Sequence, residues 1–146
     1  MAETDLRVSD LMSTEVLTLA LGDHLDLASD IMKLARIRHM PVLSNGRLVG
    51  IVSQRDLFRT AISSALSLRP AAERAWLAKI PVAEAMTKEV VTAAASWKVG
   101  RAVAVMLEKR IGCLPVVDGG RLVGLLSETD CLRLLGRLIA PEAVLP

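Results

Sequence analysis

Two similar segments make up most of this chain, and this repeat constrains the fold more than any other feature. Residues 8–61 align without a gap onto residues 82–135, with about a third of the positions identical. The similarity is greatest around Pro41 and Pro115, where each copy has a short apolar run, a glycine-containing turn and a second apolar run. The sequence therefore predicts one structural unit built twice.

Each copy is predicted to contain a short helix, a strand, a helix, a β-hairpin and a final helix. Residues 16–19 and 90–93 are short β-branched runs that are typical of strands. An Asn-Gly pair at 45–46 and a Gly-Gly pair at 119–120 supply the positive φ angles that a tight hairpin turn needs. Apolar residues recur at helical spacing between the first strand and the hairpin of each copy. The fold class is therefore α/β (α+β).

The repeat also divides the chain. We expect a first domain at 1–66, a linker with a short helix at 67–81, a second domain at 82–139 and a C-terminal tail at 140–146. The linker helix is predicted because Pro70, suited to a first helical turn, precedes a run of good helix formers.

Composition excludes several classes of protein. With 52% hydrophobic and 23% charged residues, the 146-residue chain has enough apolar surface to fold. No apolar run is long enough to cross a membrane, and the polar N-terminus does not resemble a secretory signal. A cytoplasmic location without membrane contact is the expectation.

Binding to nucleic acid and metal chemistry are not expected either. The net charge is only +2, and the aromatic residues are limited to Phe58, Trp76 and Trp97, so a basic groove with stacking platforms is not indicated. Two cysteines are too few for a disulfide framework or a four-cysteine metal site. No metal ligands are therefore predicted.

A Ser-x-x-Asp pair opens the last helix of each copy, as Ser53 with Asp56 and as Ser127 with Asp130. Taken alone, the pair favours a capping box, in which the serine oxygen and the carboxylate bind backbone amides of the first turn. A helix N-terminus also favours phosphate, and a carboxylate can accept hydrogen bonds from a ribose diol. Both interpretations stay open on the residues alone.

The Pro-Val, hairpin and Gly-x-x-Ser-x-x-Asp pattern resembles the CBS domain, named after cystathionine β-synthase, and the two copies resemble a stand-alone Bateman module. The resemblance implies two β-α-β-β-α units packed sheet to sheet about a pseudo-twofold axis. It also implies clefts between the units that bind adenosine-containing ligands such as AMP, ADP or ATP.

The resemblance assigns a role to each site residue. Asp56 and Asp130 would bind ribose hydroxyls, and Ser53, Ser127, Arg55 and Arg38 would bind phosphate. The adenine pocket would be formed by Thr18, His39, Met40 and Pro41 in the first copy and by Thr92, Cys113, Leu114 and Pro115 in the second. Because the second copy has Glu128 and Thr129 in place of Gln54 and Arg55, the first site is expected to prefer the more phosphorylated nucleotide.

The helices that follow the two motifs are too apolar for one buried face, and the resemblance agrees with a homodimer through residues 56–66 and 130–139. Catalysis is not predicted, because the two histidines lack ligand spacing and Cys113 falls in an expected core strand. The expected function is a nucleotide sensor without a catalytic cofactor that acts in trans on an unidentified protein. The alternatives are a structural dimerisation module without ligand, or a binder of S-adenosylmethionine or NAD.

Overall fold

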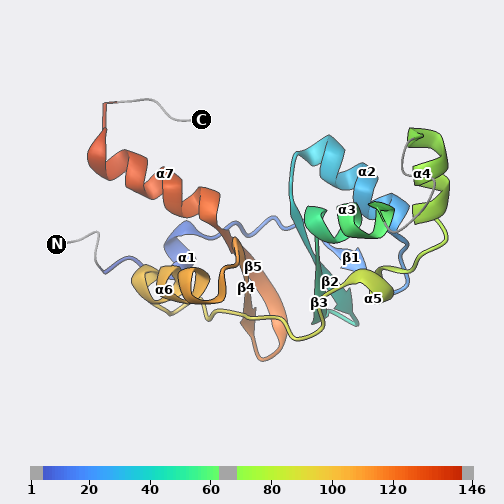
Figure 1. Ribbon diagram of the computed structural model, residues 1–146. Coiled ribbons are helices and arrows are strands. Elements are labelled where there is room, and N and C mark those ends of the chain that lie inside the picture. Colours follow the sequence, from blue (N-terminus) through green and yellow to red (C-terminus); the bar gives the residue numbers. More distant parts are fainter. Residues whose placement is uncertain (1–4, 63–68, 143–146) are drawn as a thin grey trace. The chain divides into compact units, whose positions relative to one another are not determined.

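The computed structural model describes residues 5–62 and 69–142, which form two compact units of mixed α/β structure (Figure 1). The unit 17–90 contains β1 (Leu19–Ala20), α2 (Leu25–Ala35), β2 (His39–Ser44), β3 (Arg47–Ser53), α3 (Gln54–Ile62), α4 (Pro70–Leu77) and α5 (Val82–Ala85). The unit formed by 1–16 and 91–146 contains α1 (Val8–Leu11), α6 (Val99–Lys109), β4 (Cys113–Asp118), β5 (Arg121–Ser127) and α7 (Glu128–Ile139). The predicted fold class is confirmed, whereas the packing of one unit against the other stays a prediction.

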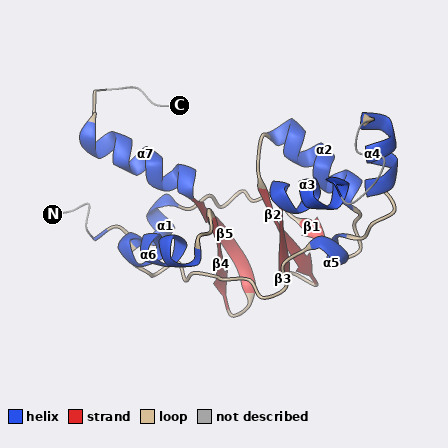
Figure 2. Ribbon diagram, viewed as in Figure 1, coloured by secondary structure: helices blue, strands red, loops and turns tan. Residues whose placement is uncertain are grey.

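Both predicted hairpins are present, one in each unit (Figure 2). Strand β2 pairs antiparallel with β3 and β4 pairs antiparallel with β5, each with a shift of register directly after the valine that follows the proline, Val42 or Val116. The turns have φ of 52° and 78° at Asn45 and Gly46, and of 58° and 83° at Gly119 and Gly120. Only glycine, and to a lesser degree asparagine, adopts these angles readily, so the turn residues determine where each hairpin folds.

The strands predicted at 16–19 and 90–93 are much shorter than expected. In the first unit only Leu19 and Ala20 pair, parallel to Val42 and Leu43. In the other unit Ala93 forms a single bridge to Val116, and the chain then turns towards α1, where Trp97 accepts a hydrogen bond from the amide of Val8. Residues 16–18 and 90–92 are not in a strand, and turns follow the pairing after one or two residues.

The two sequence repeats and the two compact units do not contain the same residues, as their cores show. Val82 of α5, which starts the second repeat, lies fully buried in the core of the first unit beside Leu25, Met40 and Val52. Val8 of α1, which starts the first repeat, lies in the core of the second unit. The two repeats have thus exchanged their first helices. The boundaries at residues 66, 81 and 139 concern the sequence repeat, and as domain boundaries they stay predictions.

The exchange explains one glycine in each hairpin. A Cβ on Gly50 would run into Sδ of Met86 and come within 3.1 Å of the carbonyl oxygen of Thr87. A Cβ on Gly124 would lie 3.0 Å from Cγ of Met12 and 3.0 Å from the carbonyl oxygen of Ser13. The segment after each exchanged helix therefore lies so close to the hairpin strand that a side chain at position 50 or 124 has no room. Only glycine fits there.

The linker helix is present as predicted, as α4, with Pro70 in its first turn. Leu77 of α4 is buried in the core of the first unit, and Arg74 binds Asp30 of α2 at 2.8 Å. Within the described residues, none of the helices has the length and apolar content needed to cross a membrane.

Candidate functional site

The predicted site residues of each copy meet at one end of that copy's hairpin, inside a single unit. In the first unit His39 is the register partner of Ser53, the last residue of β3. Thr18 directly precedes Leu19, whose parallel partner is Val42, so Thr18 lies level with Pro41. Residues from β2, from the start of α3 and from the segment before β1 are therefore brought together.

The second unit repeats this arrangement. Cys113 is the register partner of Ser127, and Thr92 precedes Ala93, whose amide donates a 2.9 Å hydrogen bond to the carbonyl of Pro115. Asp130 follows in the first turn of α7. The two sites thus have the same framework, which we call the first site, built on Ser53 and Asp56, and the second site, built on Ser127 and Asp130.

Both Ser-x-x-Asp pairs form the capping interactions. The amide of Ser53 donates to Oδ2 of Asp56 at 2.7 Å, and the amide of Asp56 donates to Oγ of Ser53 at 3.1 Å. The corresponding bonds at Ser127 and Asp130 measure 2.8 and 3.3 Å. The motif therefore starts both helices, as its spacing predicts.

Each capping box uses Oδ2 of its aspartate, so Oδ1 is the carboxylate oxygen outside the capping bonds. Oδ1 of Asp56 lies 3.7 Å from a guanidinium nitrogen of Arg59, and Oδ1 of Asp130 lies 3.7 Å from the equivalent atom of Arg133. These distances exceed a hydrogen bond, so each Oδ1 has a cation nearby and can still accept a hydrogen bond from a ligand. The carboxylates are nearly buried, with side-chain exposures of 14% and 11%.

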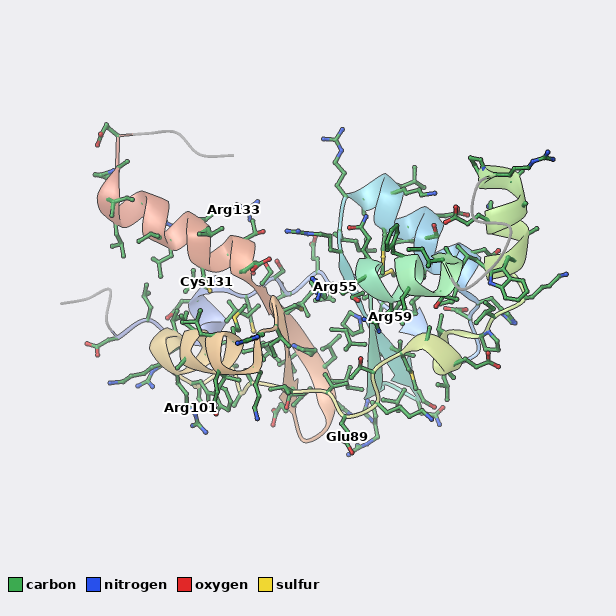
Figure 3. All side chains as sticks on the ribbon, viewed as in Figure 1. Arg55, Arg59, Glu89, Arg101, Cys131 and Arg133 are labelled. Carbon is green, nitrogen blue, oxygen red and sulfur yellow. The ribbon has the colours of Figure 1, made fainter. Side chains whose placement is uncertain are left out.

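Arg59 and Arg133 are not among the site residues predicted from the sequence. The signal was available, because an arginine stands three residues after the aspartate in both copies. In a helix this spacing places the two side chains on one face. Figure 3 shows Arg55 and Arg59 on α3, and Arg133 on α7.

Some backbone amides at the start of α3 already donate hydrogen bonds to other atoms of the protein. Besides the Asp56 amide, the amide of Gln54 donates a 2.8 Å bond to the carbonyl of Arg38. In the second site the amide of Glu128 donates a 2.9 Å bond to the carbonyl of Gly112. Two of the first three amides of each helix thus bind protein atoms, so phosphate recognition would fall more on side chains.

Most of the expected pocket residues on the strands are buried, Pro41, Cys113 and Pro115 as well as Met40 and Leu114. Met40 and Leu114 are fully buried, each in the apolar core of its own unit. His39 is half-buried and Cys113 is buried, whereas Arg38 and Arg55 are exposed. A ligand at this end of the hairpin would therefore meet the backbone of Met40 and Leu114 rather than their side chains.

The two thiols are poorly suited to nucleophilic chemistry. Burial, followed by the charge of Asp130, raises the pKa of the Cys113 thiol to about 12. Burial and the charges of Asp130 and Glu128 also raise the pKa of Cys131. With raised pKa values, both thiols stay protonated near neutral pH. The thiolate is the reactive form, so neither thiol is a good nucleophile. In the described part of the chain, no three His, Cys, Asp or Glu side chains are grouped so as to hold a metal ion.

Comparison with known proteins agrees with this framework. The model of the CBS domain family matches residues 8–63 and 82–137. A CBS domain-containing protein of Dictyostelium discoideum is 33% identical over 137 residues, which cover 92% of this chain and 94% of that protein. The chain spans about half or less of the first curated relatives it matches, among them a homoserine O-acetyltransferase of which it covers 25%.

Solved structures show the same fold. A Vibrio cholerae protein, provisionally assigned to acetoin utilization as AcuB, has a TM-score of 0.77 and 31% identity, with 97% of this chain and 98% of that one covered. The CBS domain pair of protein MJ0100, solved with 5′-methylthioadenosine and S-adenosyl-L-methionine, has a TM-score of 0.76 and 28% identity. That match covers 90% of this chain and 96% of the other.

Proposed function

The chain belongs to the CBS domain family as a tandem pair of domains, and we propose that it is a regulatory module that binds an adenosine-containing ligand at each of its two sites. The observation that carries the proposal is the repeated framework, in which a serine, an aspartate and an arginine recur at the end of both hairpins. The bound ligands of the MJ0100 domain pair are adenosine compounds and support this choice of ligand.

We assign the ribose to the aspartates. Oδ2 of Asp56 and of Asp130 binds the serine amide, which fixes the carboxylate in one orientation. Oδ1 then accepts a hydrogen bond from a ribose hydroxyl, beside the guanidinium of Arg59 or Arg133. Hydrogen bonds to an ionised acceptor are about twice as strong as neutral ones, so this contact contributes much of the affinity.

We assign a phosphate group to Ser53, Arg38 and Arg55 in the first site. The Ser53 oxygen accepts a bond from the Asp56 amide, and a hydroxyl also has one proton to donate. The two arginines are exposed and carry long side chains that reach a phosphate. With these cations, the first site takes AMP, ADP or ATP and favours the more phosphorylated nucleotide.

The adenine is assigned to the backbone beside the prolines and to the two threonines. His39, Pro41 and Thr18 form this part of the first site, and Cys113, Pro115 and Thr92 form it in the second. Among these residues only His39 has an aromatic ring, the kind that can stack on a base. Backbone hydrogen bonds and aliphatic contacts therefore hold the adenine.

Regulation follows from linkage. A ligand that binds one arrangement of the module more tightly than another shifts the module towards that arrangement, by as much as the difference in affinity. A protein that binds this arrangement in trans is then regulated by ligand concentration. This role is regulatory rather than catalytic, in agreement with the protonated thiols.

The module is also proposed to form a homodimer through α3 and α7. Apolar side chains are exposed on both helices, at Phe58 and Ile62 of α3 and at Leu132, Leu135, Leu138 and Ile139 of α7. Exposed apolar residues grouped on a helix indicate a protein interface.

A purely structural module is the second candidate. The complete capping boxes support it, because they explain both Ser-x-x-Asp pairs without a ligand. It does not explain why an arginine stands beside each aspartate, since an exposed ion pair contributes little to stability.

Calorimetric titration with AMP decides between the two candidates. We expect binding by the natural protein and at least about tenfold weaker binding by the Asp56→Asn, Asp130→Asn double variant. Asp118→Asn, an exposed aspartate outside both sites, is the matched control and should leave the affinity unchanged. Equal affinity of the natural protein and the double variant would contradict the ribose assignment.

A further inference from the structure

We propose that Glu128 is a specificity-determining residue, which makes the second site reject adenosine compounds with a 5′-phosphate and prefer those with a positive charge at the 5′ position. The inference rests on the proposed function, because it assumes that both sites bind adenosine. It names the class of ligand for one of them.

The Glu128 carboxylate lies against the wall of the second site. A Cβ added to Gly112 would stand 3.1 Å from both Cδ and Oε1 of Glu128. The amide of Glu128 also donates its hydrogen bond to the Gly112 carbonyl, at 2.9 Å. The carboxylate therefore packs over the residue that precedes Cys113, next in the chain to Ser127.

The same backbone contact in the first site carries different side chains. There the amide of Gln54 donates to the carbonyl of Arg38, at 2.8 Å. Position by position, the first site has a neutral amide and a cation where the second has a carboxylate and a glycine. Because the backbone hydrogen bond is the same in both sites, the side chains of these two pairs of residues occupy equivalent positions and differ in charge.

Ser127 adds a second difference. Its hydroxyl donates to Oδ2 of Asp130 at 3.1 Å, besides accepting from the Asp130 amide. A hydroxyl has one proton, so the Ser127 oxygen faces an incoming ligand as an acceptor. An acceptor binds a cationic or donor group and repels a phosphate oxygen.

The thiols nearby sense the same negative charge. Asp130 raises the pKa of Cys113, and Asp130 together with Glu128 raises the pKa of Cys131, in both cases in addition to the effect of burial. Arg133 is the cation beside Asp130, and its side chain is 52% exposed. Figure 3 shows Cys131 and Arg133 together on α7. Glu128 and Arg133 are both exposed, so solvent screens their charges alike, whereas the Asp130 carboxylate is buried and acts on the site at short range.

A reciprocal exchange of the two equivalent residues tests the proposal. Glu128→Gln gives the second site the side chain of the first, and Gln54→Glu gives the first site that of the second, with little change of shape. Each site is observed separately by NMR, through the backbone amide signals of Thr18 and Thr92. The probes are adenosine, AMP and S-adenosylmethionine, which differ in charge at the 5′ position.

In the natural protein we expect adenosine to shift both signals, AMP to shift Thr18 at lower concentration than Thr92, and S-adenosylmethionine to favour Thr92. Glu128→Gln should strengthen AMP binding at the second site by about tenfold and weaken S-adenosylmethionine there. Gln54→Glu should weaken AMP at the first site by a similar factor. Glu128→Ala provides the same test should Glu128→Gln fail to fold.

The outcomes separate this inference from the function on which it rests. If adenosine shifts neither signal, the proposed function is wrong, and the inference with it. If adenosine shifts both signals but the exchange leaves the AMP affinities of the two sites unchanged, binding stands and the role of Glu128 is overturned.

Discussion

Ser53 and Asp56 bind each other through two hydrogen bonds, with the Ser53 amide on Oδ2 of the aspartate at 2.7 Å and the Asp56 amide on the serine oxygen at 3.1 Å. The same residues that we assign to ligand recognition therefore also start a helix. Substitutions at the motif affect folding and binding together, and experiments must separate the two effects.

The first prediction concerns this structural role. Asp130→Ala removes the acceptor of the Ser127 amide and should lower the free energy of unfolding by about 1–2 kcal/mol. Asp130→Asn keeps an oxygen that accepts this bond and should cost less. Urea unfolding without ligand measures both variants, and an unchanged midpoint for Asp130→Ala would show that the capping bonds are not needed for stability.

The second prediction concerns the exchanged helices. Gly50→Ala and Gly124→Ala should each lower the free energy of unfolding by about 1–3 kcal/mol, because the new methyl group overlaps Met86 or Met12 and a backbone carbonyl. Gly100→Ala in α6 is the control. Its Cβ meets nothing within 4 Å, and alanine favours the helix, so stability should rise by about 0.5–1 kcal/mol. Equal effects at the three glycines would refute the close packing.

The third prediction concerns alkaline pH. The pKa of the Cys113 thiol is raised from 9.0 to about 12, so below pH 9 the thiol is protonated in both the folded and the unfolded chain. Above pH 9 the unfolded chain loses this proton first, and the free energy of unfolding must fall as the pH rises towards 12. Cys113→Ala should flatten this slope, measured by urea unfolding from pH 8 to pH 10.5. A slope that does not change would argue against a buried thiol.

The fourth prediction concerns assembly. Light scattering at micromolar concentration should give the mass of a dimer, and Leu135→Arg should give that of a monomer, because Leu135 is 50% exposed in the apolar face of α7. Leu34→Arg is the control, since Leu34 is 86% exposed on α2, outside the proposed interface. A monomeric natural protein would contradict the dimer.

Most of the fold could be predicted because local rules determine it. The Asn-Gly and Gly-Gly turns define the hairpins, and apolar spacing together with Pro70 identified the helices. The exchange of α1 and α5 could not be predicted, because Val8 and Val82 look alike in the sequence and each fits the core of either copy. Its one trace in the sequence is the glycine in the second strand of each hairpin, Gly50 and Gly124.

The site was predicted less completely than the fold. The motif serine and aspartate lie where the spacing predicts, at the start of α3 and α7. The direction of a strand residue depends on the register, however, so the burial of Met40 and Leu114 in the cores could not be derived from their place before a proline. The contact between Glu128 and Gly112 likewise depends on how two segments meet in space.

Thermal unfolding in the presence of adenosine compounds tests the central claim most directly. At one hundred times its dissociation constant, AMP or S-adenosylmethionine should stabilise the natural protein by about 2.7 kcal/mol, a rise in midpoint of roughly 5–10 °C. The Asp56→Asn, Asp130→Asn double variant should show little of this rise. If no adenosine compound moves the midpoint of the natural protein, the module is structural and the binding function proposed for both sites is wrong.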